Sequence, residues 1–181
     1  MEYVFIALGL ALLVGLVFAM TGATRRRWRE AFSEHFTKAG FSLDPEAEHF
    51  RATRGETTVE VLTPPWDDEV LATRISVFAE GVAPAFQLLR ARASGAHHPQ
   101  IPFAELAPKW TAYSADLDAA KLRLGQSGGA ITELARGTEH LAAVEIGDDA
   151  VALWFDNPIT DFELLDRARA TAERLAAEWR S

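Results

Sequence analysis

The feature that most constrains this chain is an uncharged run close to its first residue. Residues 3–20 contain no charged side chain, and the uncharged stretch continues to Thr24. A helix of 18–22 residues is about 27–33 Å long, which matches a bilayer hydrocarbon core of about 30 Å. Residues 1–24 are therefore predicted to form a transmembrane anchor.

The charges that flank this run predict its orientation. Only Glu2 and the amino terminus precede the run, whereas four arginines follow it: Arg25, Arg26, Arg27 and Arg29. The positive-inside rule places such a cluster in the cytoplasm. We expect a single-pass protein of the cell membrane, with its N-terminus outside, its C-terminal domain cytoplasmic and the four arginines at lipid headgroups. A signal peptide normally carries its basic residues before the apolar run, although small residues near 19–23 leave cleavage as an alternative.

Small residues recur every four positions along the predicted anchor: Ala7, Ala11, Gly15, Ala19 and Ala23. This spacing allows two membrane helices to approach closely, so a homodimer through this face is one interpretation. The other is that alanine and glycine are simply frequent in membrane helices and in this chain.

Charge divides the rest of the chain into two parts. Residues 24–54 carry seven Arg and Lys against five Asp and Glu, a net of +2, whereas residues 55–181 carry eleven against twenty, a net of −9. Basic charge next to the bilayer favours anionic headgroups. The acidic body argues against nucleic acid as a partner, because nucleic-acid binding needs a basic face.

A basic, amphipathic juxtamembrane helix is predicted within residues 25–42. Its apolar positions recur at spacings of three and four: Trp28, Phe32, His35, Phe36 and Ala39. This stripe packs on the folded domain in one interpretation and lies in the membrane interface in the other. His35 is interpreted as a packed side chain and not as a ligand.

Residues 43–181 are predicted to form an α+β domain. Period-2 patterns and turn residues indicate strands over 50–53, 57–62, 71–79, 86–93, 108–114, 141–146 and 150–155. Residues 86–93 also fit a helix, but we favour a strand that forms a hairpin with 71–79 through Glu80-Gly81. Runs of strands without alternating helices favour a mainly antiparallel sheet with helices on one face.

Helices are predicted in two places, directly after the strand at 108–114 and at the C-terminal end of the sequence. Residues 116–124 and 130–136 fit two short helices separated by a glycine-rich linker at 125–129. A long C-terminal helix is expected after Thr160, which forms a capping box with Glu163. Its apolar stripe comprises Leu165, Ala168, Ala172, Leu175 and Trp179.

The order of these segments resembles uncharacterised single-pass, membrane-anchored proteins of high-GC bacteria. The stretches that carry the resemblance are KWTAYSADLDAAKLRL and VEIGDDAVALWF, together with 15 Arg against 3 Lys. The resemblance covers the layout of the chain and implies no activity and no catalytic residue.

A search for known chemistry identifies no catalytic, cofactor or metal site. The sequence has no cysteine, no P-loop, no dinucleotide fingerprint and no HExxH or GxSxG motif. His97-His98 together with Glu139 and His140 could hold a metal, but a solvated loop is the simpler interpretation. The acidic groups at 67–69 and 148–149 resemble carboxylate clusters for a hard cation, but both lie at predicted turns, where Asp is favoured.

Three tryptophans are candidates for binding a partner: Trp66, Trp110 and Trp154. On a strand, Trp154 points away from Leu153 and Phe155, so it is exposed unless a helix covers that face. The function favoured by these features is a membrane-tethered, non-catalytic interaction or scaffold domain. The alternatives are a membrane-bound sensor of a small ligand and an enzyme with an unrecognised site.

Overall fold

The computed structural model describes residues 27, 29–46, 50–61, 73–90, 100–101, 109–147, 149–157, 159 and 161–180. Contacts divide the chain into two units, Met1–Gly40 and Phe41–Ser181, and each is described by itself. The predicted anchor and its small-residue face, from Ala7 to Ala23, lie outside the described residues. Within the described residues, no helix is both long enough and apolar enough to cross a bilayer.

In the first unit, residues 29–38 are helical. Arg27 and Arg29 are exposed, whereas Arg25, Arg26 and Trp28 lie outside the described residues. The rings of Phe32 and Phe36 lie 6.0 Å apart, and the His35 ring meets Phe36 edge-on at 5.2 Å. These contacts agree with the predicted aromatic stripe, and the surface that the stripe packs against stays a prediction.

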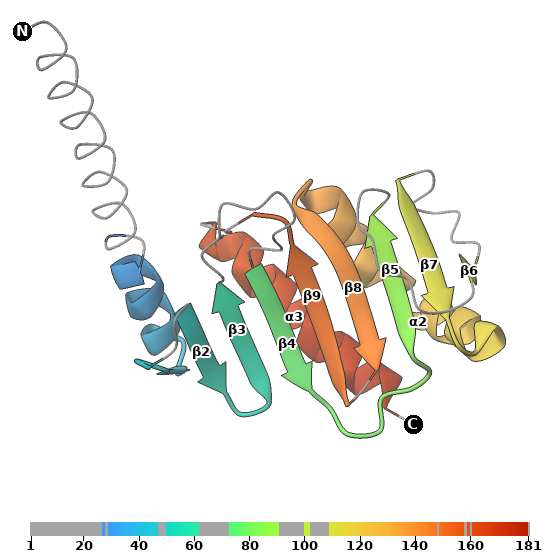
Figure 1. Ribbon diagram of the computed structural model, residues 1–181, viewed down its shortest axis with the longest axis horizontal. Helices are drawn as coiled ribbons and strands as arrows, with labels where there is room; N and C mark the ends of the chain where they lie inside the picture. The colour runs from blue at the N-terminus through green and yellow to red at the C-terminus, as the bar shows by residue number, and fades with distance from the viewer. Residues whose placement is uncertain are drawn as a thin grey trace, which may run out of the picture. The chain divides into compact units, whose positions relative to one another are not determined.

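The second unit contains a nine-stranded antiparallel sheet in its described residues (Figure 1). The strands are β1 (Ser42–Leu43), β2 (Phe50–Arg54), β3 (Thr57–Val61), β4 (Thr73–Phe78), β5 (Phe86–Arg90), β6 (Gln100–Ile101), β7 (Trp110–Ser114), β8 (Leu141–Gly147) and β9 (Ala150–Phe155). Their order across the sheet is β1-β2-β3-β4-β9-β8-β5-β7-β6. The prediction of an α+β fold with a large antiparallel sheet is confirmed.

The predicted hairpin between β4 and β5 is wrong. The β8–β9 hairpin lies between these two strands, with β9 paired to β4 and β8 paired to β5. The connection of residues 79–85 crosses the end of that hairpin, where Ala79 donates to the Asp149 carbonyl at 2.7 Å. Glu80-Gly81 thus belongs to a crossing connection, which local turn chemistry cannot distinguish from a hairpin.

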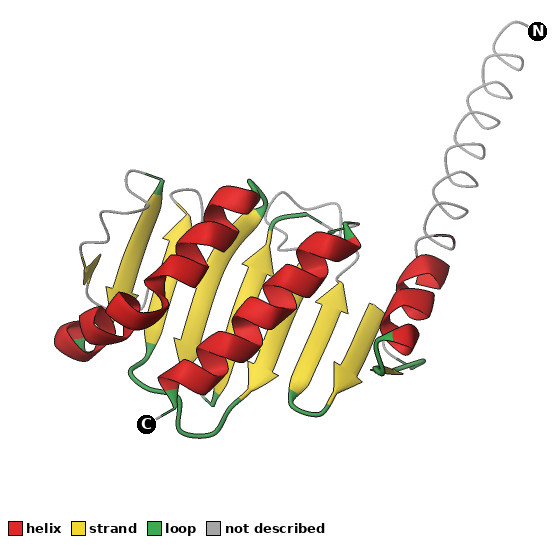
Figure 2. Ribbon diagram, turned by 180° about the vertical axis from the view of Figure 1, so that it is seen from behind, coloured by secondary structure: helices red, strands yellow, loops and turns green. Residues whose placement is uncertain are grey.

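Two helices lie in the described residues of the second unit, α2 (Leu117–Gly137) and α3 (Phe162–Trp179), and both pack on the same face of the sheet (Figure 2). α2 is continuous through the glycine-rich stretch, so the prediction of two short helices is wrong. Ser127 and Gly128 are buried in the middle of α2, and Ser127 accepts a 2.9 Å hydrogen bond from the Trp179 indole. Small residues therefore serve close packing against α3 and do not interrupt the helix.

The helix α3 begins and packs nearly as its sequence predicts. Its N-cap is Asp161, one residue after the predicted Thr160, and the Asp161 carboxylate accepts from the amides of Glu163 and Leu164 at 2.9 and 3.2 Å. The predicted apolar stripe is buried along its whole length: Leu165, Ala168, Ala172, Leu175 and Trp179. The C-terminal helix is therefore confirmed as the element that covers the central strands.

Candidate functional site

The sheet face opposite α2 and α3 is the candidate functional site, and we call it the open face. On β4, Ile75 and Val77 are buried toward the helices, whereas Arg74, Ser76 and Phe78 alternate with them and point the other way. Among the described residues of the second unit, no helix packs on this second face (Figures 1 and 2). An antiparallel sheet can leave one face to solvent in this way.

A row of polar and aromatic side chains crosses the open face. Sheet pairing places Arg51 opposite Glu60, Glu60 opposite Arg74, and Arg74 opposite Trp154. The row continues through the neighbouring strands β8 and β5. Its members, in order across six strands, are Arg51, Glu60, Arg74, Trp154, Glu145 and Gln87.

The first half of the row is built around Glu60. Its carboxylate accepts from Arg51 Nε at 2.7 Å and lies 2.6 Å from Arg51 Nη2, so one guanidinium approaches it with two nitrogens. The Glu60 side chain is only 10% exposed. A carboxylate at this depth needs a close cation to offset its lost hydration, and Arg51 provides it.

The centre of the row is a stack of Arg74 on Trp154. The guanidinium carbon lies 4.8 Å from the centroid of the Trp154 ring, within the range of a cation–π contact. The nearest Arg74–Glu60 ion pair, from Nη1 to Oε2, is 3.7 Å long. The Nε of Arg74 is buried and has no hydrogen-bond partner among the described residues.

In the second half of the row, Glu145 holds the indole of Trp154 by a hydrogen bond at the edge of the ring. Trp154 Nε1 donates to Glu145 Oε2 at 2.8 Å, and Gln87 Nε2 donates to Glu145 Oε1 at 3.4 Å. Trp154 is half-buried. The predicted covering helix is absent from the described part of this face, and Arg74 shields the ring instead. The row is thus a pre-ordered surface with a cation at its centre.

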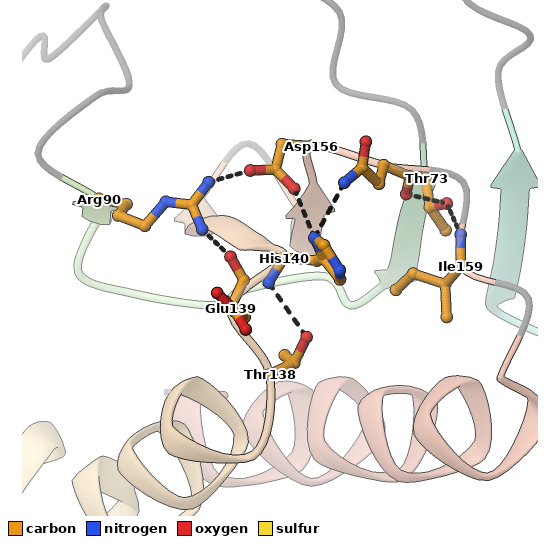
Figure 3. A network of polar contacts seen from close by, with 8 residues as sticks. Thr73, Arg90, Thr138, Glu139, His140, Asp156 and Ile159 are labelled. Carbon is orange, nitrogen blue, oxygen red and sulfur yellow. Dashed lines mark hydrogen bonds and ion pairs between the residues drawn. The ribbon is translucent and has the colours of Figure 1, made fainter.

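A second polar cluster closes the end of the sheet where β5 and β9 finish (Figure 3). The Arg90 guanidinium donates to the Glu139 carbonyl and to Asp156. His140 Nδ1 lies 3.3 Å from Asp156 Oδ1 and 3.0 Å from the Asn157 amide nitrogen. These contacts tie the α2–β8 connection to the chain that leads into α3.

The hydrogen bonds of the His140–Asp156 pair depend on which ring nitrogen of His140 carries the proton. In a catalytic dyad, Nδ1–H donates to the carboxylate, which leaves Nε2 free to accept a proton. Here Nδ1 faces both the Asp156 carboxylate and the Asn157 amide nitrogen, so each tautomer of the ring satisfies one of the two contacts, and the geometry does not assign a catalytic dyad. Among the described residues, no group of three or more His, Cys, Asp or Glu side chains could hold a metal.

A shallow groove lies between α2 and α3 on the helical layer. Its volume is about 250 Å³, and its lining includes Leu134, Leu164, Arg167 and Arg174. Ligand sites for small molecules usually measure about 300–1,000 Å³ and bury most of the ligand. The groove is therefore small for a sensor pocket, although its arginines could meet an anion.

The structure separates two of the three predicted tryptophans, Trp110 and Trp154. Trp154 lies at the centre of the open face, whereas Trp110 is buried at 8% exposure on the same side of β7 as Ala112. Trp66 lies outside the described residues, as do His97 and His98. The charged members of the row were not singled out from the sequence. Their alternating positions in β2, β3 and β4 predict that they share one face of the sheet. The alternation does not predict which strands pair and therefore which of these side chains meet.

Comparisons with known proteins identify the fold. No family model and no curated protein matches this chain. Among solved structures, the mycobacterial trehalose monomycolate transport factor A, TtfA, is similar with a TM-score of 0.57 at 13% identity. The similarity covers 85% of this chain and 93% of that chain. At this identity the likeness concerns the fold alone.

Proposed function

We propose that this chain is a membrane-tethered, non-catalytic interaction domain that binds a protein partner on the open face. The observation that carries the proposal is the stack of Arg74 on Trp154 in the middle of an ordered polar row. Arg and Trp are among the residue types that dominate binding energy at protein interfaces. A side chain that is already ordered loses less conformational entropy on binding.

The surroundings of the stack suit a broad contact. Phe78 lies on the same face of β4 and is 55% exposed, which makes it an apolar neighbour for a partner. Ser76 stands between Phe78 and Arg74 and is small, so it leaves room beside the guanidinium. An apolar side chain next to a shielded cation is the composition expected at the centre of an interface.

The tether in this proposal comes from the sequence. The uncharged run of residues 3–20 would span the bilayer, and Arg25, Arg26, Arg27 and Arg29 would contact lipid headgroups. The shared fold with a mycobacterial trehalose monomycolate transport factor supports one narrower version, in which the partner takes part in transport. This version rests on the fold and needs its own test.

Site-specific crosslinking tests the proposal in native membranes. A photoreactive amino acid replaces Phe78 in the full chain, and a matched control replaces Leu122, which is 68% exposed on α2. We expect a discrete protein adduct from position 78 and none from position 122. An adduct from position 122 alone would move the interface to the helical layer, and no adduct from either position would refute the proposal.

The second candidate is a sensor of a small anionic ligand, which the groove between α2 and α3 favours. Arg167 and Arg174 line it together with Leu134 and Leu164. In a panel of anionic metabolites, the ligand would raise the melting temperature of the full chain. The substitution Arg167→Gln would abolish this rise. A panel that leaves the melting temperature unchanged removes this candidate for the compounds used.

A further inference from the structure

We propose that Arg74 is an anchor for a carboxylate, supplied by an Asp or Glu side chain of the protein partner. This inference rests on the proposed function of the open face and names the chemistry that the face recognises. It follows from three properties of Arg74: its unsatisfied donors, its fixed orientation and the charges beside it.

Among the described residues, the Arg74 guanidinium makes only a long ion pair, because its nearest acceptor, Glu60, is already occupied by Arg51. Glu60 takes the close approach of Arg51, with nitrogen–oxygen distances of 2.6 and 2.7 Å. The Arg74–Glu60 distance of 3.7 Å exceeds a hydrogen bond. In the described part of the chain, no hydrogen bond from the Arg74 guanidinium is found, and its Nε is buried without an acceptor.

The orientation of Arg74 is fixed before a partner arrives. The guanidinium carbon lies over the Trp154 ring, and the indole N–H donates to Glu145. The Arg74 side chain is 37% exposed although its Nε is buried, so the exposed part belongs to the rest of the side chain. A planar guanidinium held in this way matches the two oxygens of a carboxylate.

The neighbouring charges select a monoanion. Glu60 and Glu145 flank the Arg74–Trp154 stack along the row. Arg51 and Arg74 balance Glu60 and Glu145, so the formal charge of these four side chains is zero, and a doubly charged phosphate gains no net attraction there to offset its larger cost of dehydration. A protein carboxylate is therefore the occupant that the site favours.

Side-chain NMR of the full chain in detergent micelles provides a direct test. The probes are N-acetylglutamate methylamide, the matched N-acetylglutamine methylamide and inorganic phosphate. We expect the glutamate probe to shift the Arg74 Nε–Hε resonance saturably, with at least about tenfold higher affinity than the glutamine probe. The Arg51 resonance should not shift, because Glu60 already occupies that guanidinium. Equal shifts at Arg51 and Arg74, a preference for phosphate, or no shift would each overturn the inference.

Crosslinking from position 78 separates this inference from the proposed function. Arg74→Lys keeps the charge but removes the planar fork, and we expect it to lower the adduct yield about tenfold. The matched control Arg136→Lys, at an exposed position of α2 on the helical layer, should leave the yield within about twofold of the starting chain. An unchanged yield in the folded Arg74→Lys chain refutes the carboxylate anchor and leaves the open face as the interface. No adduct in any chain refutes the proposed function itself.

Discussion

The indole N–H of Trp179 is satisfied by a small side chain, the hydroxyl of Ser127. The indole is fully buried and donates to Ser127 Oγ at 2.9 Å, and Ser127 in turn donates to the Arg123 carbonyl at 2.9 Å. The sequence places Trp179 on a buried stripe by its spacing. It does not reveal the acceptor, because Ser127 lies 52 residues away on another helix.

Ser127→Ala is expected to lower the free energy of unfolding by about 1–3 kcal/mol, since the buried indole N–H loses its acceptor. Urea denaturation of the full chain measures the change. Gln126→Ala is the matched control, because Gln126 is exposed on the same helix, and it should stay within about 0.5 kcal/mol of the starting chain. A loss as small as that of the control would show that water satisfies the indole.

Glu34 forms a pH-dependent ion pair within the helix of residues 29–38. Lys38 lies one helical turn away, with its Nζ 2.6 Å from Glu34 Oε1. The hydrogen bond and the positive charge of Lys38 lower the pKa of Glu34 below its ordinary value. Folding with this pair is therefore favoured above the ordinary pKa of Glu34, and the gain disappears as the pH falls through the lowered value. NMR titration should show Lys38→Gln returning the Glu34 pKa toward its ordinary range, and an unchanged pKa would contradict the pairing.

At the scale of elements, α2 shows where local sequence signals mislead. Glycine disfavours a helix interior, and this preference predicts a break at residues 125–129. Packing against α3 outweighs the preference, because Trp179 reaches Ser127 in the middle of the stretch. The strand positions and the stripe of α3 were predictable, since alternation and helical spacing are local.

Two glycines of α2 are expected to be replaceable with a gain in stability. A Cβ at Gly125 or Gly129 meets no atom within 4 Å, so Gly125→Ala and Gly129→Ala should each raise the free energy of unfolding by about 0.5–1 kcal/mol. Gly55→Ala is the control: its site is equally open, but its φ of +56° penalises alanine by about 1–2 kcal/mol. Urea denaturation distinguishes the three. A loss of stability at position 125 or 129 would indicate that the helix face needs glycine for another contact.

At the scale of the whole molecule, the sequence predicts orientation through its basic cluster. A reporter fused to the C-terminus should read as cytoplasmic. Replacing Arg25, Arg26, Arg27 and Arg29 with Gln should lower the cytoplasmic fraction, because the positive charge that holds this flank inside is lost. Replacing the exposed Arg167 and Arg174 of α3 with Gln is the matched control and should leave the reporter unchanged. A periplasmic reading of the unaltered chain would reverse the predicted topology.

The open face could be predicted only in part. Alternation assigns Arg74 and Trp154 to one side of their strands, but their contact requires β4 to pair with β9. That pairing joins residues more than 70 positions apart, and no local pattern specifies it. The charged row therefore emerges from the topology and not from any motif.

The insertion of the β8–β9 hairpin between β4 and β5 also governs when the sheet can be completed. A growing chain that has reached only β7 holds β4 and β5 without the two strands that join them. Both would present unpaired edges, which are sites for aggregation. Because the joining contacts span long stretches of sequence, the sheet closes late and slowly. The interval between synthesis of β5 and synthesis of β9 is thus the time in which the unpaired edges of β4 and β5 are exposed to aggregation with other chains.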